Sequence, residues 1–254
     1  MSLIFDTHAH YDDEAFDADR ETLLASMPEH GVGLILDPGC DLESSRRAVE
    51  LARTYPRVYA AVGWHPENCA PYTEDSLDAL RAWAREPKVV AIGEIGLDYY
   101  WEQNPPRELQ QRVLRDQLAL AQELDLPVSV HDREAHAEMY ELLRQYRPRG
   151  VLHCYSGSAE DAAWLTAQGM ALGFGGAVTY KGAKRAAKVL AMVPHELAVL
   201  ETDCPYMSPE PVRGTRNDSR NIAHVAAKIG EIWQMDAQSV LDLTAENAKR
   251  IFNQ

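Results

Sequence analysis

Near its start the chain reads Leu3-Ile4-Phe5-Asp6-Thr7-His8-Ala9-His10, a short apolar run that ends in polar side chains. Such a run is typical of a buried β-strand. An open nucleotide-binding sheet would place a glycine-rich loop after its first strand, whereas this chain places two histidines there. The stretch therefore predicts a β-strand that is followed by functional side chains and not by a phosphate-binding loop.

Short apolar runs of this kind recur along the whole chain, and each is followed by a longer segment with helical spacing of apolar residues. The eight runs are Leu3–Asp6, Gly33–Leu36, Val58–Val62, Val89–Ile92, Val128–Val130, Val151–Leu152, Ala171–Phe174 and Leu197–Leu200. This alternation predicts a parallel βα array. Eight units in 254 residues predict one α/β domain over residues 1–254, a (β/α)8 TIM barrel. An open sheet, which usually has about five or six strands, is the alternative.

Sequence signals also mark where one helix begins and ends. Asn104, followed by Pro105 and Pro106, predicts an N-cap and a first helical turn, and Pro127 marks the end of the same helix. A second helix is expected over residues 14–29.

Composition and charge restrict the class of protein. With 46% hydrophobic and 25% charged residues the chain is expected to build a large core. No stretch reaches the ~18 to 20 apolar residues of a membrane span, and the start shows no secretory pattern, so we expect a cytoplasmic protein with no membrane partner. The four cysteines form no C-x-x-C pair and are expected to be free thiols.

The formal net charge of −14 opposes unspecific attraction to nucleic-acid backbones. Basic residues are nevertheless concentrated locally, at Arg107, over residues 181–188 and over residues 213–220. We expect the stretch 181–188 to be an exposed helix face and the stretch 213–220 to serve a cleft.

Residue types that bind metals follow the predicted strands. Because side chains alternate along a strand, His8 and His10 point to the same side. Four further candidates stand at later strand ends, namely Glu94, His131, His153 and Asp203. The carboxyl ends of TIM-barrel strands form the active site, so these six side chains are expected to converge. Imidazole and carboxylate groups are ligands of Zn, Mn and related ions.

Five motifs in this order resemble the signatures of the TatD family of metal-dependent deoxyribonucleases. They are Phe5-Asp6-Thr7-His8-Ala9-His10, Gly63-Trp64-His65-Pro66, Gly93-Glu94-Ile95-Gly96-Leu97-Asp98-Tyr99, His153-Cys154-Tyr155-Ser156-Gly157 and Glu201-Thr202-Asp203-Cys204-Pro205-Tyr206. The resemblance spans essentially the whole chain.

The resemblance implies a two-metal hydrolase. One divalent ion would be held by His8, His10, Glu94 and Asp203, and a second by Glu94, His131 and His153, so that Glu94 bridges. The ions would be Zn, Mn or Mg, which can polarise a phosphoryl oxygen and activate a water without a nucleophilic side chain. Asp203 is expected to act also as general base, so Asp203 and Glu94 are the candidate catalytic residues.

Five further residues are candidates for substrate binding. In similar proteins His65 belongs to the site, although a strand-end hydrogen bond is the alternative. Tyr99 begins an aromatic run that can stack on bases, with loop packing as the alternative. Arg213, Arg216 and Asn217 lie after the last predicted strand, where guanidinium groups suit phosphate oxygens.

The resemblance implies hydrolysis of DNA phosphodiester bonds, as an exonuclease on DNA ends or single-stranded DNA. One alternative is hydrolysis of another ester or amide, such as the aminoacyl bond of D-aminoacyl-tRNA, because the same metal chemistry acts on acyl carbons. Another is a metal-stabilised scaffold that binds partners without turnover. The sequence indicates no obligate protein partner and leaves the oligomeric state open.

Overall fold

The computed structural model describes residues 4–254, in which parallel strands alternate with helices along the chain. The strands are β1 (Ile4–Asp6), β2 (Val32–Pro38), β3 (Val58–Val62), β4 (Val89–Asp98), β5 (Val128–Arg133), β6 (Gly150–Leu152), β7 (Ala171–Phe174) and β8 (Ala198–Leu200). They follow one another in chain order, which is the (β/α)8 topology and confirms the predicted fold class. Leu3, the predicted first strand residue, lies outside the described residues.

The described residues form two compact units. The first comprises residues 4–37 and 153–254, and the second comprises residues 38–152. The helices of the first are α1 (Arg20–Ser26), α6 (Ala159–Ala167), α7 (Lys184–Leu190), α8 (Ile222–Trp233) and α9 (Ala237–Phe252). Those of the second are α2 (Leu42–Thr54), α3 (Glu74–Trp83), α4 (Arg107–Leu124) and α5 (His136–Tyr146). The single domain expected over residues 1–254 stays a prediction.

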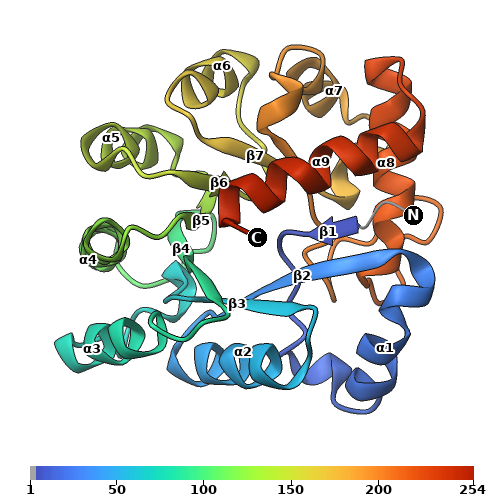
Figure 1. The fold of residues 1–254 in the computed structure, drawn as a ribbon. Coiled ribbons are helices and arrows are strands. Elements are labelled where there is room, and N and C mark those ends of the chain that lie inside the picture. The colour runs from blue at the N-terminus through green and yellow to red at the C-terminus, as the bar shows by residue number, and fades with distance from the viewer. Residues whose placement is uncertain (1–3) are drawn as a thin grey trace. The chain divides into compact units, whose positions relative to one another are not determined.

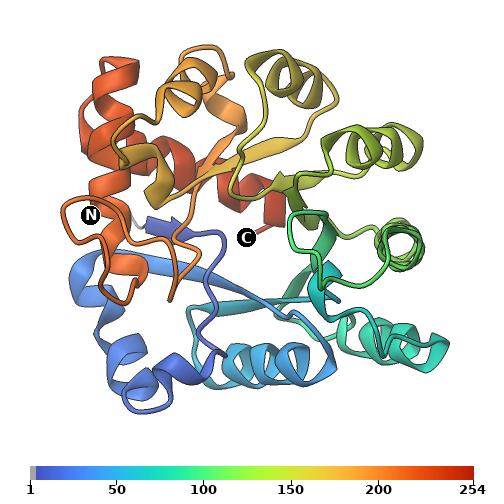
Figure 2. The ribbon, with the colours of Figure 1, turned by 180° about the vertical axis from the view of Figure 1, so that it is seen from behind.

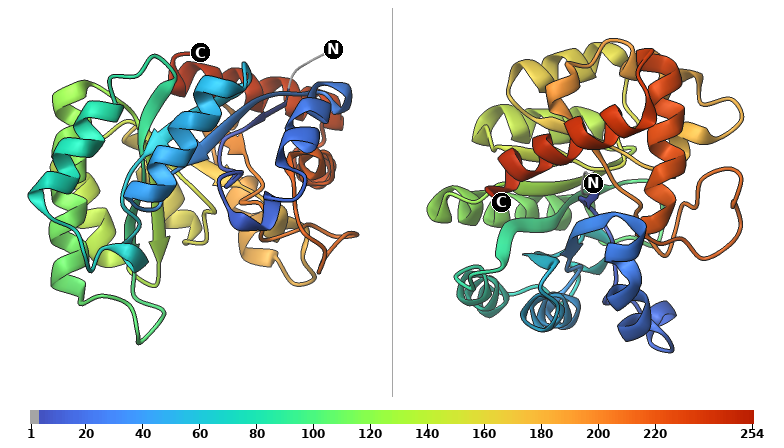
Figure 3. Two further views of the ribbon diagram at one scale, coloured as in Figure 1. Left: turned by 90° about the horizontal axis from the view of Figure 1, so that it is seen from below. Right: turned by 45° about the vertical axis from the view of Figure 1, so that its right-hand side comes forward.

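In the first unit β1 pairs with β2 and β7 pairs with β8, both in parallel. Helices α8 and α9 pack side by side, as Figure 3 shows in red. Helix α9 also covers β1, where the fully buried Phe252 ring lies 6.0 Å from that of Phe5. In Figure 2 the orange segment after β8 runs beside the blue segment after β1. A bridge between Cys204 and Ala9 joins the two segments.

In the second unit β3, β4, β5 and β6 pair in that order, and α2 packs beside β3 (Figure 1). Strand β4 is longer than the apolar run predicts, because it continues past Ile92 to Asp98 and is buried throughout. Glu94 therefore lies inside a strand and not after it. Gly96 allows the extension, since a Cβ there would meet the His131 carbonyl oxygen at 1.9 Å.

Two helix predictions need correction. Helix α4 begins at Arg107 and not at Pro105, because the Asn104 side chain donates to Asp98 and does not cap the helix. The helix predicted over residues 14–29 is divided into two 3-10 turns, Glu14–Phe16 and Met27–His30, around the short α1. Pro28, which has no N–H to donate, lies in the second turn.

Among residues 4–254, no helix combines the length and the apolar character that crossing a membrane requires.

Candidate metal centre

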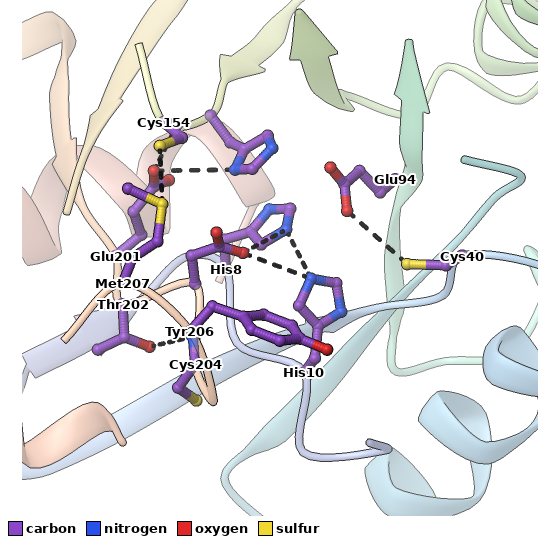
Figure 4. Close-up of polar contacts among 12 residues, drawn as sticks. His8, His10, Cys40, Glu94, Cys154, Glu201, Thr202, Cys204, Tyr206 and Met207 are labelled. Carbon is purple, nitrogen blue, oxygen red and sulfur yellow. Dashed lines mark hydrogen bonds and ion pairs between the residues drawn. The ribbon is translucent and has the colours of Figure 1, made fainter. Parts of the chain in front are cut away.

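Three predicted ligands of the first unit meet at the end of β1. The Nε2 atoms of His8 and His10 lie 3.2 Å apart (Figure 4). Asp203 Oδ1 lies 3.9 Å from His8 Nε2 and 3.6 Å from His10 Nε2. All three residues offer a ligand atom within 4.8 Å of the others. The ring of His153 stacks on that of His8, with centroids 3.8 Å apart and planes 9° apart. The structure therefore brings these four residues together.

Backbone hydrogen bonds join the two segments that carry this cluster. Asp203 N–H donates to the His8 carbonyl over 2.9 Å, and His10 N–H donates to the Cys204 carbonyl over 2.8 Å. Asp203 itself has a left-handed φ of 56°, which turns the chain directly after β8. Its carboxylate is thereby presented to the two histidines that follow β1.

Asp6 also joins the end of β1 to the segment after β8, and this connection is here called the Asp6 junction. Its buried carboxylate accepts from the Thr202 N–H (3.0 Å), the Thr202 hydroxyl (2.6 Å) and the Ser219 hydroxyl (2.7 Å). Burial raises the pKa of Asp6 to about 6 even though these hydrogen bonds favour the charged form. This role is not evident from residue type, although Asp6 stands two residues before His8 in the motif.

Glu201 is a second buried carboxyl group that the sequence analysis did not select. It accepts from the Cys154 N–H, and its Oε1 lies 3.9 Å from His153 Nδ1 (Figure 4). Gly173 makes room for it, because a Cβ there would lie 2.2 Å from Glu201 Oε2. Burial raises the pKa of Glu201 to about 8. Glu201 thus lies beside the imidazole of His153 at the distance of an ion pair, too far for a hydrogen bond.

The second unit has its own cluster around Glu94, a residue that is 3% exposed. Glu94 Oε1 lies 3.2 Å from His131 Nδ1 and 3.5 Å from His65 Nε2, and these three residues also offer ligand atoms within 4.8 Å. The Cys40 thiol donates to Glu94 Oε2 over 3.8 Å (Figure 4). His65 therefore belongs to the cluster and is not only a strand-end cap.

Asp98 holds the far side of His131. Its Oδ2 lies 3.0 Å from His131 Nε2, so the imidazole lies between two carboxylates. Burial lowers the pKa of His131, but hydrogen bonds with Asp98 and Glu94 outweigh it and raise the pKa to about 10. Burial acts to raise the pKa of Asp98, and the bond with His131 outweighs it, so that pKa is lowered.

The donor sets fit divalent metal. Each cluster supplies two imidazoles and one carboxylate. A further carboxyl group binds His131 of the second cluster, and another lies beside His153, which stacks on His8 of the first. Outer carboxylates of this kind orient metal-binding histidines in metalloproteins.

None of the four cysteines forms a disulfide, as the sequence predicts. Cys204 is fully buried, and burial raises its pKa well above the ordinary value. The sulfur of Cys154 lies 3.8 Å from that of Met207 (Figure 4). These environments do not favour a nucleophilic thiolate.

The remaining predicted substrate residues differ in their surroundings. The Tyr99 hydroxyl accepts from Gln111, and Arg107 lies over its ring at 4.2 Å. Arg213 is exposed, with its guanidinium group 4.2 Å from the centre of the Tyr180 ring.

Arg216 and Asn217 are occupied by the chain itself. Arg216 binds both carboxylate oxygens of Asp19, at 2.8 and 2.6 Å. Asn217 is fully buried and donates to the carbonyls of Thr202 and Tyr206. Asn217 thus fixes the loop that carries Asp203, and its surroundings give no support to a direct substrate contact.

Comparison with known proteins agrees with this geometry. A family model described as TatD related DNase matches residues 5–253. An uncharacterized metal-dependent hydrolase of Bacillus subtilis, YabD, is 38% identical, with 98% of this chain and 99% of that protein covered. A protein of Cronobacter sakazakii named 3'-5' ssDNA/RNA exonuclease TatD is 34% identical over 98% of this chain and 97% of its own length.

Solved structures show the same fold. The crystal structure of the Escherichia coli TatD homologue YjjV matches with a TM-score of 0.92 and 35% identity, and 99% of this chain and 98% of that one are covered. A TatD family hydrolase of Entamoeba histolytica matches in fold with a TM-score of 0.89 at 22% identity, covering 99% of both chains. With the two histidine and carboxylate clusters, these matches lead to one conclusion: the chain belongs to the TatD family of metal-dependent hydrolases.

Proposed function

We propose that this protein is a divalent-metal-dependent exonuclease that removes nucleotides from the ends of DNA or from single-stranded DNA. The observation that carries the proposal is the presence of two clusters, each with two imidazoles and a carboxylate that offer ligand atoms within 4.8 Å of one another. Relatives named 3'-5' ssDNA/RNA exonuclease at 31–35% identity support the substrate class.

The proposed metal ligands are the six predicted residues together with His65, which shares the Glu94 cluster. The predicted residues are His8, His10, Glu94, His131, His153 and Asp203. Bound divalent ions would supply Lewis-acid polarisation of the phosphodiester and activation of water. The use of two ions with Glu94 as the bridge, and their identity as Zn, Mn or Mg, stay predictions.

Asp203 is the proposed proton acceptor. Burial acts to raise its pKa, but the hydrogen bond with His10 and the nearby histidines outweigh it, so its pKa is lowered and the carboxylate is ionised at neutral pH. Its side chain keeps 19% of its surface exposed, which leaves it open to an attacking water. The Asp6 junction keeps this carboxylate aligned with the two histidines that follow β1.

Arg213 is the proposed phosphate contact, because its guanidinium group is exposed and lies 3.9 Å from the Glu210 carboxylate, whereas that of Arg216 binds both oxygens of Asp19 at 2.8 and 2.6 Å. Tyr99, Arg216 and Asn217 stay predictions as substrate residues. The cytoplasmic location and the absence of an obligate protein partner also stay predictions.

An end-labelled single-stranded DNA digest tests the proposal. The protein loaded with Mn, Zn or Mg is expected to release mononucleotides stepwise, and a chelator is expected to stop the release. Preferential turnover of D-aminoacyl-tRNA would favour the alternative ester substrate. Metal-dependent stability without turnover of either substrate would favour the scaffold.

A further inference from the structure

An aromatic pair stands out on the surface of the second unit. Among residues 4–254, the large hydrophobic side chains that are strongly exposed are Tyr100, Trp101, Met192 and Tyr206. The two on the loop after β4 are neighbours in sequence and in space, with ring centres 4.6 Å apart and planes at 87°. Tyr100 is 50% exposed and Trp101 is 43% exposed. Large aromatic side chains are mostly buried in folded proteins, so two adjacent exposed rings are unusual.

A cation completes this pair. The Arg133 guanidinium group lies 4.0 Å from the centre of the Tyr100 ring and 5.3 Å from that of Trp101. The register of the sheet produces this contact, because Arg133 on β5 pairs with Asp98 on β4, and the Tyr99 N–H donates to the Arg133 carbonyl. Arg133, which belongs to β5, thus contacts both rings, and part of each ring remains exposed to solvent.

The aromatic loop is joined to the Glu94 cluster by one carboxylate. Asp98 Oδ1 accepts from the Tyr100 N–H (3.0 Å) and from the Asn104 side chain (3.1 Å), while its Oδ2 binds His131 (3.0 Å). The Asp98 backbone is held in turn by Gln110. The rings are therefore fixed close to a proposed metal ligand.

We infer that Tyr100, Trp101 and Arg133 form a stacking platform for an unpaired nucleobase of the substrate; this inference rests on the proposed nuclease function. The net charge of −14 weakens attraction to phosphates, whereas stacking on an aromatic ring needs no positive surface. Stacking also requires an unpaired base, so the platform selects single strands over duplex.

The first test compares two substrates of equal length, a single-stranded oligonucleotide and the same backbone with abasic residues. Trp101→Ala is expected to raise KM about tenfold on the base-containing strand, the change that one stacked base supports, with kcat little changed. On the abasic strand, Trp101→Ala and the unaltered protein are expected to have equal KM. Trp101→Phe keeps a ring and is expected to restore most of the loss.

Met192→Ala is the matched control, because Met192 is 57% exposed but lies between α7 and the start of β8. It is expected to change neither KM nor kcat. Binding of a labelled oligonucleotide to chelated protein, measured by fluorescence anisotropy, gives a readout independent of turnover. Trp101→Ala is expected to raise that Kd by a similar factor.

The outcomes separate the two ideas. If the unaltered protein cleaves the base-containing strand and Trp101→Ala has the same KM and Kd, the platform is wrong while the nuclease stands. If neither strand is cleaved by the metal-loaded protein, the proposed function itself fails.

Discussion

The two clusters of histidines and carboxylates contain the same chemical groups but are built differently. In the first unit, ligands from the end of β1 meet Asp203 in the loop after β8, and the buried Asp6 carboxylate ties the segments together. In the second, Glu94 and His131 lie inside the paired strands β4 and β5. In the first unit a buried polar network thus brings together residues that are distant in the chain. In the second unit the pairing of neighbouring strands does so.

The difference indicates where each cluster is vulnerable. The first has only a short backbone bridge between its two segments and depends in addition on side-chain hydrogen bonds between residues about two hundred positions apart in the chain, such as Ser219 to Asp6. The second depends on backbone pairing, with Asp98 as the additional support of His131. Substitutions of the supporting carboxylates are therefore expected to act on each cluster separately.

The largest effect is expected from Asp203→Asn. The amide keeps the size of the side chain but cannot accept a proton as a carboxylate does, so kcat is expected to fall about 10³-fold, within the range for loss of a general base. Metal content is measured alongside turnover. Full metal occupancy with nearly unchanged kcat would remove Asp203 from the catalytic role.

A smaller effect is expected from the supporting carboxylates. Asp98→Asn weakens the bond that orients His131, and Asp6→Asn weakens the Thr202 and Ser219 bonds. Each is expected to lower metal affinity about 10- to 100-fold. Calorimetric titration of the metal-free protein with a divalent metal measures this affinity.

The two substitutions also sharpen the comparison. Asp6→Asn is expected to lower the melting temperature more than Asp98→Asn does, because it disturbs the buried hydrogen bonds that join the two chain segments of its cluster, whereas the backbone pairing of β4 with β5 remains in Asp98→Asn. Equal losses of stability would show that the two clusters are held in the same way.

The pH dependence of the melting temperature of the metal-free protein tests the second cluster. Because the pKa of His131 is raised from 6.5 to about 10, its protonated form stabilises the fold fully below pH 6.5, and this stabilisation is lost as pH rises through about 10. The melting temperature of chelated protein is therefore expected to fall across this window. Between pH 8.5 and 10 the fall should be shallower for His131→Asn, and parallel curves would contradict the assignment.

The smallest effect is expected at the exposed arginines. Arg213→Ala is expected to raise KM for DNA about three- to tenfold with unchanged kcat, since one charge-assisted phosphate contact is removed. Arg216→Ala loses its exposed pair with Asp19 and is expected to affect stability slightly and KM little. Steady-state kinetics of both variants show which arginine contacts the substrate. An equal rise in KM for Arg216→Ala would indicate that Arg216 also contacts it.

Much of the site was predictable because strand periodicity is local. The alternation in His8-Ala9-His10 and the polar residues at strand ends identified all six proposed ligands from residue types alone. Resemblance to the family added His65. The extension of β4 through Glu94 was not predictable from its apolar run, because it depends on glycines that let neighbouring backbones approach closely.

Other features depend on partners distant in the chain. Asp6 and Glu201 are ordinary acidic residues in the sequence, and only burial beside Thr202, Ser219 and Cys154 shows what they support. In the same way Asn217 was assigned to substrate from its position, while its amide is used by the Thr202 and Tyr206 carbonyls.

The sequence alone determined the (β/α)8 class, the family and the residue types of the candidate metal centre, since hydrophobic period and motif order are encoded locally. Only the tertiary structure decided which carboxyl groups support which histidines and which aromatic rings stay exposed. These properties arise from burial and from contacts between residues far apart in the chain, and neither is encoded in a short stretch of sequence.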